Sequence, residues 1–315
     1  MDRLLVICGP TATGKTSLAV KLAKKFNGEL ISADSRQLYQ GMDIGTGKDQ
    51  PKGIKIHLID VVKPNQEFSV SQYYRLAWQA IKKIWKKGKL PILVGGTGLY
   101  IKAVVNGIGT MEIPPNPQLR KSLEGKKADE LFGELGKLDP IRAAKMNVSD
   151  KKNLRRLIRA IEISRWQAEN ESWAPLEHKR PETLLIGLKA SYDFLYQRID
   201  QRVKERVKMG QEKEIKNLLK KGYSWENSVL GTTLGYQEWQ LFFEGKTDRE
   251  EVIKRWQFAE HAYARRQMTW FKKALRQAQG KDKQINWFDI SEKRWQDRVV
   301  KLVKGWLAKK NAQKS

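Results

Sequence analysis

The feature that most constrains this chain is a glycine-rich stretch near the N-terminus, Gly9-Pro10-Thr11-Ala12-Thr13-Gly14-Lys15-Thr16. It fits the pattern G-x-x-x-x-G-K-[ST] of a phosphate-binding loop. The apolar run from Leu4 to Cys8 predicts a buried strand before it, and apolar residues at a spacing of four predict a helix after it. Such a strand, loop and helix N-terminus direct backbone N–H groups at one point, where the helix dipole also favours an anion. An ordinary glycine-rich turn lacks this context, so the sequence predicts a site for diphosphate or polyphosphate.

Every residue of this loop is a candidate ligand of a nucleotide or diphosphate, and two of them add side-chain chemistry. Lys15 supplies a positive charge, and the Thr16 hydroxyl is a candidate ligand of Mg²⁺, the one cofactor that the sequence implies. Further along the chain, Arg198, Arg202 and Arg206 recur every four residues on a predicted helix. An arginine from this row is able to close over the phosphates, and we expect Arg202 to do so.

The net charge restricts the class of partner. The 315 residues include 61 Lys and Arg against 35 Asp and Glu, a formal net charge of +26 at pH 7. This balance favours a polyanionic partner. A lysine-rich surface that serves only solubility has the same composition and is the alternative.

Cysteine content and hydropathy indicate the compartment. The single cysteine, Cys8, excludes a disulfide framework and a cysteine zinc site. No signal-peptide pattern and no apolar run long enough to span a bilayer is present. We expect a cytoplasmic protein without a membrane partner, and a monomer.

Two predicted strands end in an acidic residue. The strand at residues 28–34 ends in Asp34, and ligands of open α/β sheets lie at the carboxyl ends of strands. Asp34 is therefore a candidate general base beside the phosphates, and a helix N-cap is the alternative. The strand at residues 54–60 ends in Asp60, which resembles the acid that holds Mg²⁺ in many phosphate-loop NTPases.

Two glycine-containing stretches have open interpretations. A strand from Leu90 ends in Gly95-Gly96, followed by Thr97. The glycines allow a close backbone approach with a hydroxyl beside it, or only a tight turn. Residues 41–48 form a second phosphate contact or only a flexible connector.

Composition changes after residue 107. A proline-rich hinge at 113–117 is followed by about 70 residues that read as helices, and strand character returns at 183–188. We predict an α/β fold, a phosphate-loop NTPase-like parallel sheet flanked by helices, formed by residues 1–112 and 181–315. Residues 113–180 are predicted to form a mainly helical insertion domain.

The most basic helix of the predicted insertion spans residues 151–162. Its predicted apolar stripe runs from Leu154 to Ile161, which leaves Arg155, Arg156 and Arg159 for another surface. That surface suits phosphate contacts, although a solvated face is the usual explanation of such a run.

Together these stretches resemble the tRNA dimethylallyltransferases, or isopentenyl-tRNA transferases. The combination of the phosphate loop with D-S-x-Q-x-Y, G-G-T-x-L-Y and R-Q-x-T-W-F is very specific, and the resemblance covers nearly the whole chain. Gly47 departs from it, because alanine is usual there. In order, the resemblance is carried by residues 9–16, 34–39, 43–46, 57–60, 95–100, 155–162, 234–236 and 265–271.

The resemblance implies transfer of a dimethylallyl group from dimethylallyl diphosphate to N6 of an adenosine in tRNA, usually adenosine-37. It also implies that the phosphate loop holds the diphosphate leaving group and that Asp34 accepts the N6 proton, with Lys15 and Thr97 beside it. The insertion is implied to grip the anticodon stem-loop. The residues implied to contact tRNA are Asp34, Ser35, Arg36, Gln37, Thr97, Arg120, Arg155, Arg156 and Arg159.

Three alternatives stay open on the sequence alone. One is a small-metabolite kinase, in which Asp60 holds Mg²⁺ and Asp34 deprotonates a hydroxyl. Another is a prenyltransferase that acts on free adenine nucleotides, and the third is a non-catalytic RNA-binding protein switched by a nucleotide. The net charge and the basic insertion fit the kinase and the free-nucleotide enzyme poorly.

Overall fold

The structure is a computed structural model that describes residues 2–48, 51, 53–170, 172, 181–274 and 285–309. The chain divides into two compact units, Met1–Asn106 with Arg180–Ser315, and Gly107–Lys179. The second unit thus begins at residue 107, whereas the proline-rich hinge predicts residue 113. Residues 171 and 173–180 of the predicted insertion lie outside the described residues.

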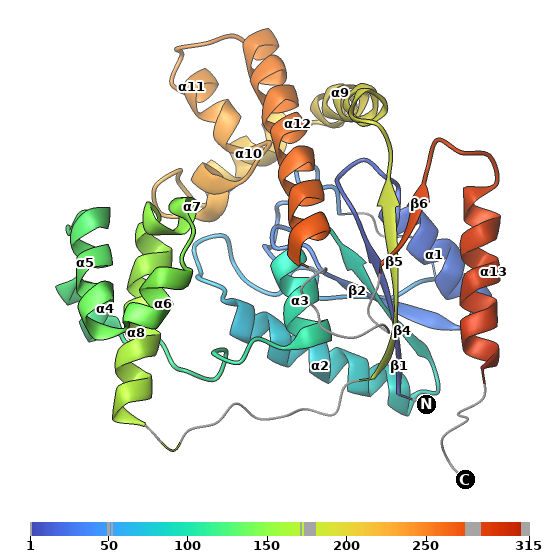
Figure 1. Cartoon of the computed structure of the whole chain (residues 1–315). Coiled ribbons are helices and arrows are strands. Elements are labelled where there is room, and N and C mark those ends of the chain that lie inside the picture. The colour runs from blue at the N-terminus through green and yellow to red at the C-terminus, as the bar shows by residue number, and fades with distance from the viewer. Residues whose placement is uncertain are drawn as a thin grey trace. The chain divides into compact units, whose positions relative to one another are not determined.

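The first unit is built on a six-stranded parallel sheet in the order β3-β2-β4-β1-β5-β6 (Figure 1). The predicted α/β fold with a parallel sheet is confirmed. Strand β6 was not expected, since four residues are too few to show an alternating pattern. The strands are β1 (Arg3–Cys8), β2 (Gly28–Ser32), β3 (Ile56–His57), β4 (Leu90–Gly95), β5 (Glu182–Lys189) and β6 (Asn286–Asp289).

The centre of the sheet is apolar on both faces. All six residues of β1 are buried, and Val6 pairs with Leu93 of β4 on one side and Leu185 of β5 on the other. Near-continuous apolar strands are typical of parallel sheets that are covered on both faces. The loop that follows β1 therefore starts from the buried centre of the sheet.

Helices cover both faces of this sheet. One face packs against α1 (Lys15–Lys25) and α13 (Trp295–Ala308), on the right in Figure 1, and the other against α2 (Val70–Lys86) and α3 (Gly98–Asn106). Ser69 starts α2 with a capping box to Gln72, close to the start that the sequence predicts. No helix in the described part of the chain is both long and apolar enough to cross a membrane.

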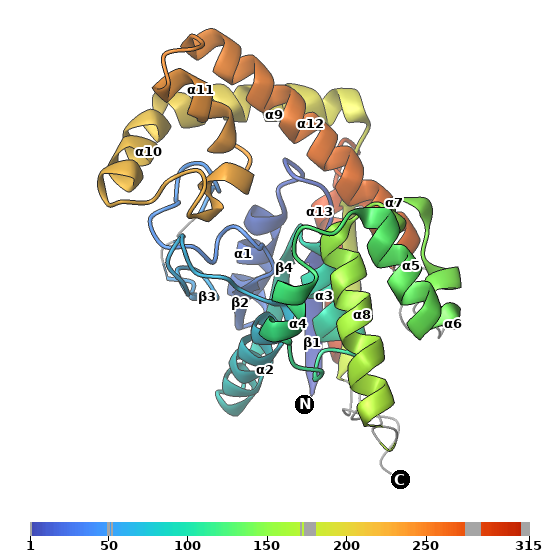
Figure 2. The same cartoon turned by 90° about the vertical axis from the view of Figure 1, so that its left-hand side faces the viewer.

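Two long helices lie at the carboxyl ends of the strands. These are α9 (Tyr192–Lys208) and α12 (Arg249–Ala274), which pack against each other and cross at an angle (Figures 1 and 2). Ile199 and Val203 of α9 pack against Trp256 and Ala264 of α12, and Ala12 of the phosphate loop joins this cluster. The shorter α10 (Gln211–Lys220) and α11 (Gln240–Phe243) lie between them in the sequence.

The second unit is helical, and Figure 2 shows its elements. Leu131, Leu135, Leu157 and Ile161 form its core. The prediction that Leu154 belongs to the apolar stripe is wrong, because this first helical residue is 47% exposed. The helices are α4 (Pro117–Ser122), α5 (Ala128–Leu138), α6 (Pro140–Lys145), α7 (Val148–Lys151) and α8 (Leu154–Glu169).

Candidate active site

The loop between β1 and α1 has the backbone geometry of an anion cradle. Gly9, Ala12 and Gly14 have φ angles of 139°, 63° and 76°, so the chain curls around the start of α1. A Cβ at Gly9 would collide with the backbone of Leu188 in β5, which requires glycine there. The first turn of α1 contains no acidic residue and its N-cap Gly14 has no side chain, so the helix N-terminus favours an anion.

Lys15 folds back over this cradle. Its Nζ donates a hydrogen bond of 2.7 Å to the carbonyl oxygen of Pro10, and the Thr13 hydroxyl donates to the same oxygen. Desolvation and the positive charge of Arg202 lower the pKa of Lys15 to about 8, while the charge of Asp34 acts in the opposite direction. A bound anion would favour the charged amine, so Lys15 is suited to a phosphate ligand.

The predicted arginine row of α9 faces the same loop. Arg198 Nε donates to the carbonyl oxygen of Ala12 at 2.8 Å, and Arg202 Nη2 donates to Thr11 Oγ1 at 2.7 Å. Arg206, one turn further, donates to a carbonyl oxygen of the 41–48 loop. Arg202 thus lies where the sequence predicts it, and Arg198 is a second guanidinium at the cradle that the sequence analysis did not select.

Gln267 of α12 joins the cradle to the Gly95-Gly96 turn. Its Oε1 accepts a hydrogen bond of 2.8 Å from the Thr11 N–H, and its Nε2 donates to the Gly96 carbonyl at 3.0 Å. A Cβ at Gly96 would collide with this amide, so the turn is a place of close approach, one of the two interpretations left open. Gln267 is a site residue that the sequence did not predict, although it lies within the specific R-Q-x-T-W-F stretch.

Asp34 and Thr97 meet at the ends of the adjacent strands β2 and β4. Asp34 Oδ1 accepts a hydrogen bond of 2.8 Å from the Arg36 N–H within a turn, and no helix follows, so the N-cap alternative for Asp34 is wrong. Thr97 Oγ1 accepts a hydrogen bond of 2.9 Å from the Ser35 N–H. Asp34 therefore has a fixed orientation close enough to Lys15 for its charge to act there.

Tyrosines surround this carboxylate. Burial and the charge of Asp34 both raise the pKa of Tyr263, whose hydroxyl shares a hydrogen bond with Thr97. The Tyr73 and Tyr100 rings stack with their centroids 3.8 Å apart, and burial first and Asp34 in part raise both pKa values. All three stay protonated at neutral pH, so these neighbours of the carboxylate are uncharged.

The predicted tRNA-contact strip continues from Asp34 to Gln37. Arg36 Nη2 donates to the Thr232 carbonyl at 2.9 Å. The Gln37 amide is held on both sides, since it accepts from Ser32 Oγ and donates to the Gly47 carbonyl at 3.0 Å. The structure thus gives Gln37 an internal role, and contact of this strip with tRNA stays a prediction.

The 41–48 loop is neither a free connector nor a phosphate contact. The Glu214 carboxylate of α10 accepts hydrogen bonds from the N–H groups of residues 43–45 and from the Tyr236 hydroxyl. These three N–H groups already have an acceptor, so they are not available to bind phosphate. Gly47 has a φ angle of 64°, in the left-handed region that favours glycine.

The prediction of a strand over residues 54–60 that ends in Asp60 is wrong. Only Ile56–His57 of the predicted strand 54–60 form β3, an edge strand separated from β1 by β2 and β4. Asp60 instead pairs with the buried Lys48 amine, which also contacts Asp43 at 2.7 Å. Asp60 is thus a structural counter-ion on the far edge of the sheet.

Thr16 stays a candidate ligand for a metal. It is the second residue of α1 and half-buried at the cradle. Among the described residues, no group of three or more His, Cys, Asp or Glu side chains could hold an ion. This fits Mg²⁺ that is bound mainly through phosphate oxygens and water, since that ion often keeps few protein ligands.

In the second unit, two predicted tRNA contacts bind an internal carboxylate. Glu162, 2% exposed, accepts hydrogen bonds from Arg120 Nε at 2.6 Å and Arg159 Nη1 at 3.0 Å. Although burial raises its pKa, these hydrogen bonds and one from the Asn116 N–H outweigh that effect and lower the pKa. Arg159 also donates to the Ile113 carbonyl at 2.8 Å, so it braces the start of the unit.

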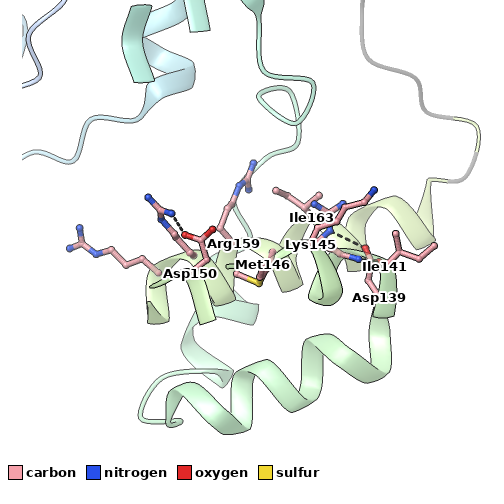
Figure 3. A pocket seen from close by; sticks show the side chains of 11 residues that line it. Asp139, Ile141, Lys145, Met146, Asp150, Arg159 and Ile163 are labelled. Carbon is pink, nitrogen blue, oxygen red and sulfur yellow. Dashed lines mark hydrogen bonds and ion pairs between the residues drawn. The ribbon is translucent and has the colours of Figure 1, made fainter. Parts of the chain in front are cut away.

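The second unit also contains a basic hollow of about 620 Å³ (Figure 3). Arg156 pairs with Asp150, and Arg142 is held by Asp139 at 2.9 Å. Arg155 is exposed, as the sequence predicts. The side chains that line the hollow are Asp139, Ile141, Arg142, Lys145, Met146, Asp150, Arg155, Arg156, Arg159, Ala160 and Ile163.

Known proteins share these features over most of the chain. The model of the family described as IPP transferase matches residues 37–274. The tRNA dimethylallyltransferase of Roseiflexus sp. (strain RS-1) is 40% identical over 283 residues, which cover 87% of this chain and 91% of that protein. The tRNA dimethylallyltransferase of Thermomicrobium roseum is 37% identical, and the match covers 95% of this chain and 90% of that protein.

Solved structures agree with these matches. The crystal structure of the full-length tRNA isopentenylpyrophosphate transferase from Bacillus halodurans is 35% identical, with a TM-score of 0.68, and the match covers 98% of this chain and 96% of that one. A eukaryotic dimethylallyltransferase described as acting on tRNA has a TM-score of 0.84 at 26% identity, over 100% of this chain and 82% of that one. The chain therefore belongs to the IPP transferase family.

Proposed function

We propose that this enzyme transfers a dimethylallyl group from dimethylallyl diphosphate to N6 of adenosine-37 in tRNAs and releases diphosphate. One observation carries the proposal. Asp34 and Thr97 each follow, by two residues, one of the adjacent strands β2 and β4 beside the cradle at the end of β1, and the charge of Asp34 reaches Lys15. The names of the relatives, tRNA dimethylallyltransferases, support the same reaction.

The cradle acts on the leaving group. The bond between C1 of the dimethylallyl group and the diphosphate oxygen breaks, and its electron pair stays on that oxygen. The loop N–H groups, Lys15 and Arg202 stabilise the charge that develops there, as preorganised donors do in other enzymes. Arg198 adds a second guanidinium from the adjacent helical turn.

Asp34 acts on the incoming nucleophile. Adenine N6 forms the new bond to C1 and loses one proton, which Asp34 accepts. Because Oδ1 of Asp34 is already bound to the Arg36 N–H, the other carboxylate oxygen serves N6. The adenine must leave the anticodon-loop stack to reach this group, at a cost of about a few kcal/mol.

Magnesium enters the proposal through Thr16. The ion would be held by the Thr16 hydroxyl together with diphosphate oxygens and water, and it would neutralise charge on the leaving group. Lys15 and Arg202 hold the same diphosphate independently of the ion.

The basic hollow of the second unit supplies a contact surface for tRNA. Arg155 and Lys145 line it without an ion pair in the described residues, so they suit backbone phosphates of the anticodon stem-loop. Phosphate contacts of this kind position an RNA and make its binding depend on salt. Adenosine-37 itself is selected by the first unit.

The alternatives fit the geometry less well. A metabolite kinase would need Asp60 near the phosphates, but that side chain pairs with Lys48 at the other edge of the sheet. An RNA-binding switch needs no carboxylate that is fixed beside the cradle. An enzyme for free adenine nucleotides needs no basic hollow in a separate unit.

One experiment separates all of these functions. The protein is incubated with dimethylallyl diphosphate, Mg²⁺ and bulk tRNA, and the nucleosides are then analysed by mass. We expect N6-dimethylallyladenosine in tRNA, none in reactions that contain ATP instead of the prenyl donor, and little when AMP replaces tRNA. Phosphate transfer from ATP to a small molecule, or unmodified tRNA in every reaction, would refute the proposal.

A further inference from the structure

A buried carboxylate lies among the cations of the cradle. Glu260, on α12, is 6% exposed, and its Oε2 lies 3.1 Å from Arg202 Nη2. Its other oxygen lies 3.6 Å from Arg206 Nη1. The reaction proposed above gives this side chain no role, although its charge also reaches Lys15.

The hydrogen bonds of Arg202 are incomplete in this arrangement. Nη2 is shared between Thr11 Oγ1 and Glu260, which places the guanidinium against the phosphate loop. The Arg202 Nε atom is buried and has no hydrogen-bond partner among the described residues. Buried donors are rarely left unpaired, so the present arrangement satisfies the hydrogen bonds of Arg202 only in part.

We propose that Glu260 is a positioning residue that holds Arg202 beside the phosphate loop and then competes with the bound diphosphate for the same guanidinium. The inference rests on the proposed function, because it takes the ligand of the cradle to be a diphosphate. The carboxylate and the diphosphate are both anions that share one cation. Glu260 therefore weakens the binding of the donor and of the product, and speeds the release of diphosphate.

The sign of this effect separates it from simple structural support. If Glu260 only braced α9 against α12, any substitution would loosen Arg202 and weaken diphosphate binding. If it competes, removal of its charge strengthens binding, since like charges at short range repel even in a polar protein interior.

The experiment measures the affinity for inorganic pyrophosphate by titration calorimetry. We expect Glu260→Gln, which keeps the shape, to bind pyrophosphate about tenfold more tightly than the wild type. Glu260→Asp keeps the charge but shortens the side chain, so we expect a smaller increase of about twofold to threefold. Burst kinetics should show later turnovers that are slower relative to the first in Glu260→Gln, because diphosphate leaves more slowly.

The matched control is Glu250→Gln, an exposed residue of the same helix with the same change of charge, whose pyrophosphate affinity should not change. Equal or weaker binding by Glu260→Gln overturns the inference and leaves the proposed function intact. If the Gln variant does not fold, weaker binding by Glu260→Asp has the same consequence. A wild-type protein that does not bind pyrophosphate overturns both proposals.

Discussion

Asp34 and Asp60 are two acidic residues that follow predicted strands, and the structure gives them opposite environments. Asp34 follows β2, the strand next to β4, keeps one carboxylate oxygen outside its turn and influences Lys15. Asp60 lies on the edge of the sheet, where Lys48 neutralises it. Residue type and local pattern are similar, so the position of each strand in the sheet decides which acid is able to act as a base.

The first prediction concerns this base. Asp34→Ala should lower dimethylallyl transfer by at least about 100-fold, since a positioned general base contributes a factor of that order. Binding of tRNA should persist, because the second unit and its basic hollow are unchanged. Single-turnover rates and a filter-binding assay measure the two effects, with the exposed Asp129→Ala as control. Wild-type rates in Asp34→Ala would remove this residue from the mechanism.

The second prediction concerns Lys15 and pH. Its pKa is lowered from 10.5 to about 8, so the amine is charged below pH 8 and loses its proton above it. A diphosphate prefers the charged form, so its affinity should fall by up to about tenfold per pH unit above pH 8. Lys15→Arg should be less sensitive to pH, since arginine stays protonated.

Titrations of pyrophosphate at pH 7, 8 and 9 test this prediction. Pyrophosphate ionises in the same way in both experiments, so the difference in slope between the wild type and Lys15→Arg reports the ionisation of Lys15 alone. Identical slopes would mean that the charge of Lys15 does not govern binding.

At the scale of elements, α12 organises the site. It contributes Gln267 to the cradle, Tyr263 to the surroundings of Asp34 and Glu260 to the arginine row. These residues lie on one helix at spacings of three and four, so they share one face. The R-Q-x-T-W-F stretch thus lies on the helix that connects the loops at the carboxyl ends of β1 and β4.

The third prediction follows from that junction. Gln267→Ala leaves the Thr11 N–H and the Gly96 carbonyl without their partner, which should cost about 1–3 kcal/mol of unfolding free energy. Affinity for pyrophosphate should fall as well, because Thr11 belongs to the cradle. Gln257→Ala is the control, since that amide makes one longer hydrogen bond of 3.3 Å. Urea unfolding should show a larger loss for Gln267→Ala than for the control.

The fourth prediction concerns a second contact between elements, at the opposite end of the sheet. Glu29 of β2 accepts hydrogen bonds from His57, Lys87 and Lys89. Burial raises its pKa, but these partners outweigh burial and lower it from 4.5 to about 2. Glu29 therefore stabilises the fold above pH 4.5, and this stability is lost as the pH falls towards 2.

The ionised Glu29 carboxylate should contribute at most about 3 kcal/mol to the free energy of unfolding. Glu29→Gln should be clearly less stable than the wild type at pH 7, and this difference should shrink at pH 3. The exposed Glu67→Gln serves as control. A difference that does not depend on pH would mean that packing, not the charge of Glu29, is responsible.

At the scale of the whole molecule, the proposed chemistry belongs to the first unit, and the proposed phosphate contacts to the anticodon stem-loop belong to the second. The cradle and Asp34 belong to the first unit, and the basic hollow belongs to the second. The two functions should therefore respond to different substitutions.

The fifth prediction tests this separation. The double variant Arg155→Ala, Arg156→Ala should weaken tRNA binding and reduce the slope of log affinity against log salt by about 1 to 2. Pyrophosphate affinity should stay unchanged. Arg165→Ala, on the same helix but outside the hollow, is the control. If only thermal stability changes in the double variant, the basic helix serves as scaffold.

The sequence by itself determined the features that depend on neighbours along the chain. Residues 9–16, the capped start of α2 and the apolar strands β1, β4 and β5 follow from local spacing, glycine content and capping. The parallel sheet follows from the same alternation of strands and helices. The helical character of residues 117–169 is equally local.

Only the tertiary structure decided which polar side chains meet. Gln267 accepts a hydrogen bond from Thr11, 256 positions away in the sequence, and Lys48 forms an ion pair with Asp60. Glu162 accepts hydrogen bonds from two arginines that the sequence predicts to contact tRNA. A buried charge must find a partner wherever the fold brings one close, and no local pattern reports that partner. The order of the strands decides which side chains come into contact, so Asp34 lies close to the cradle and Asp60 lies at the edge of the sheet.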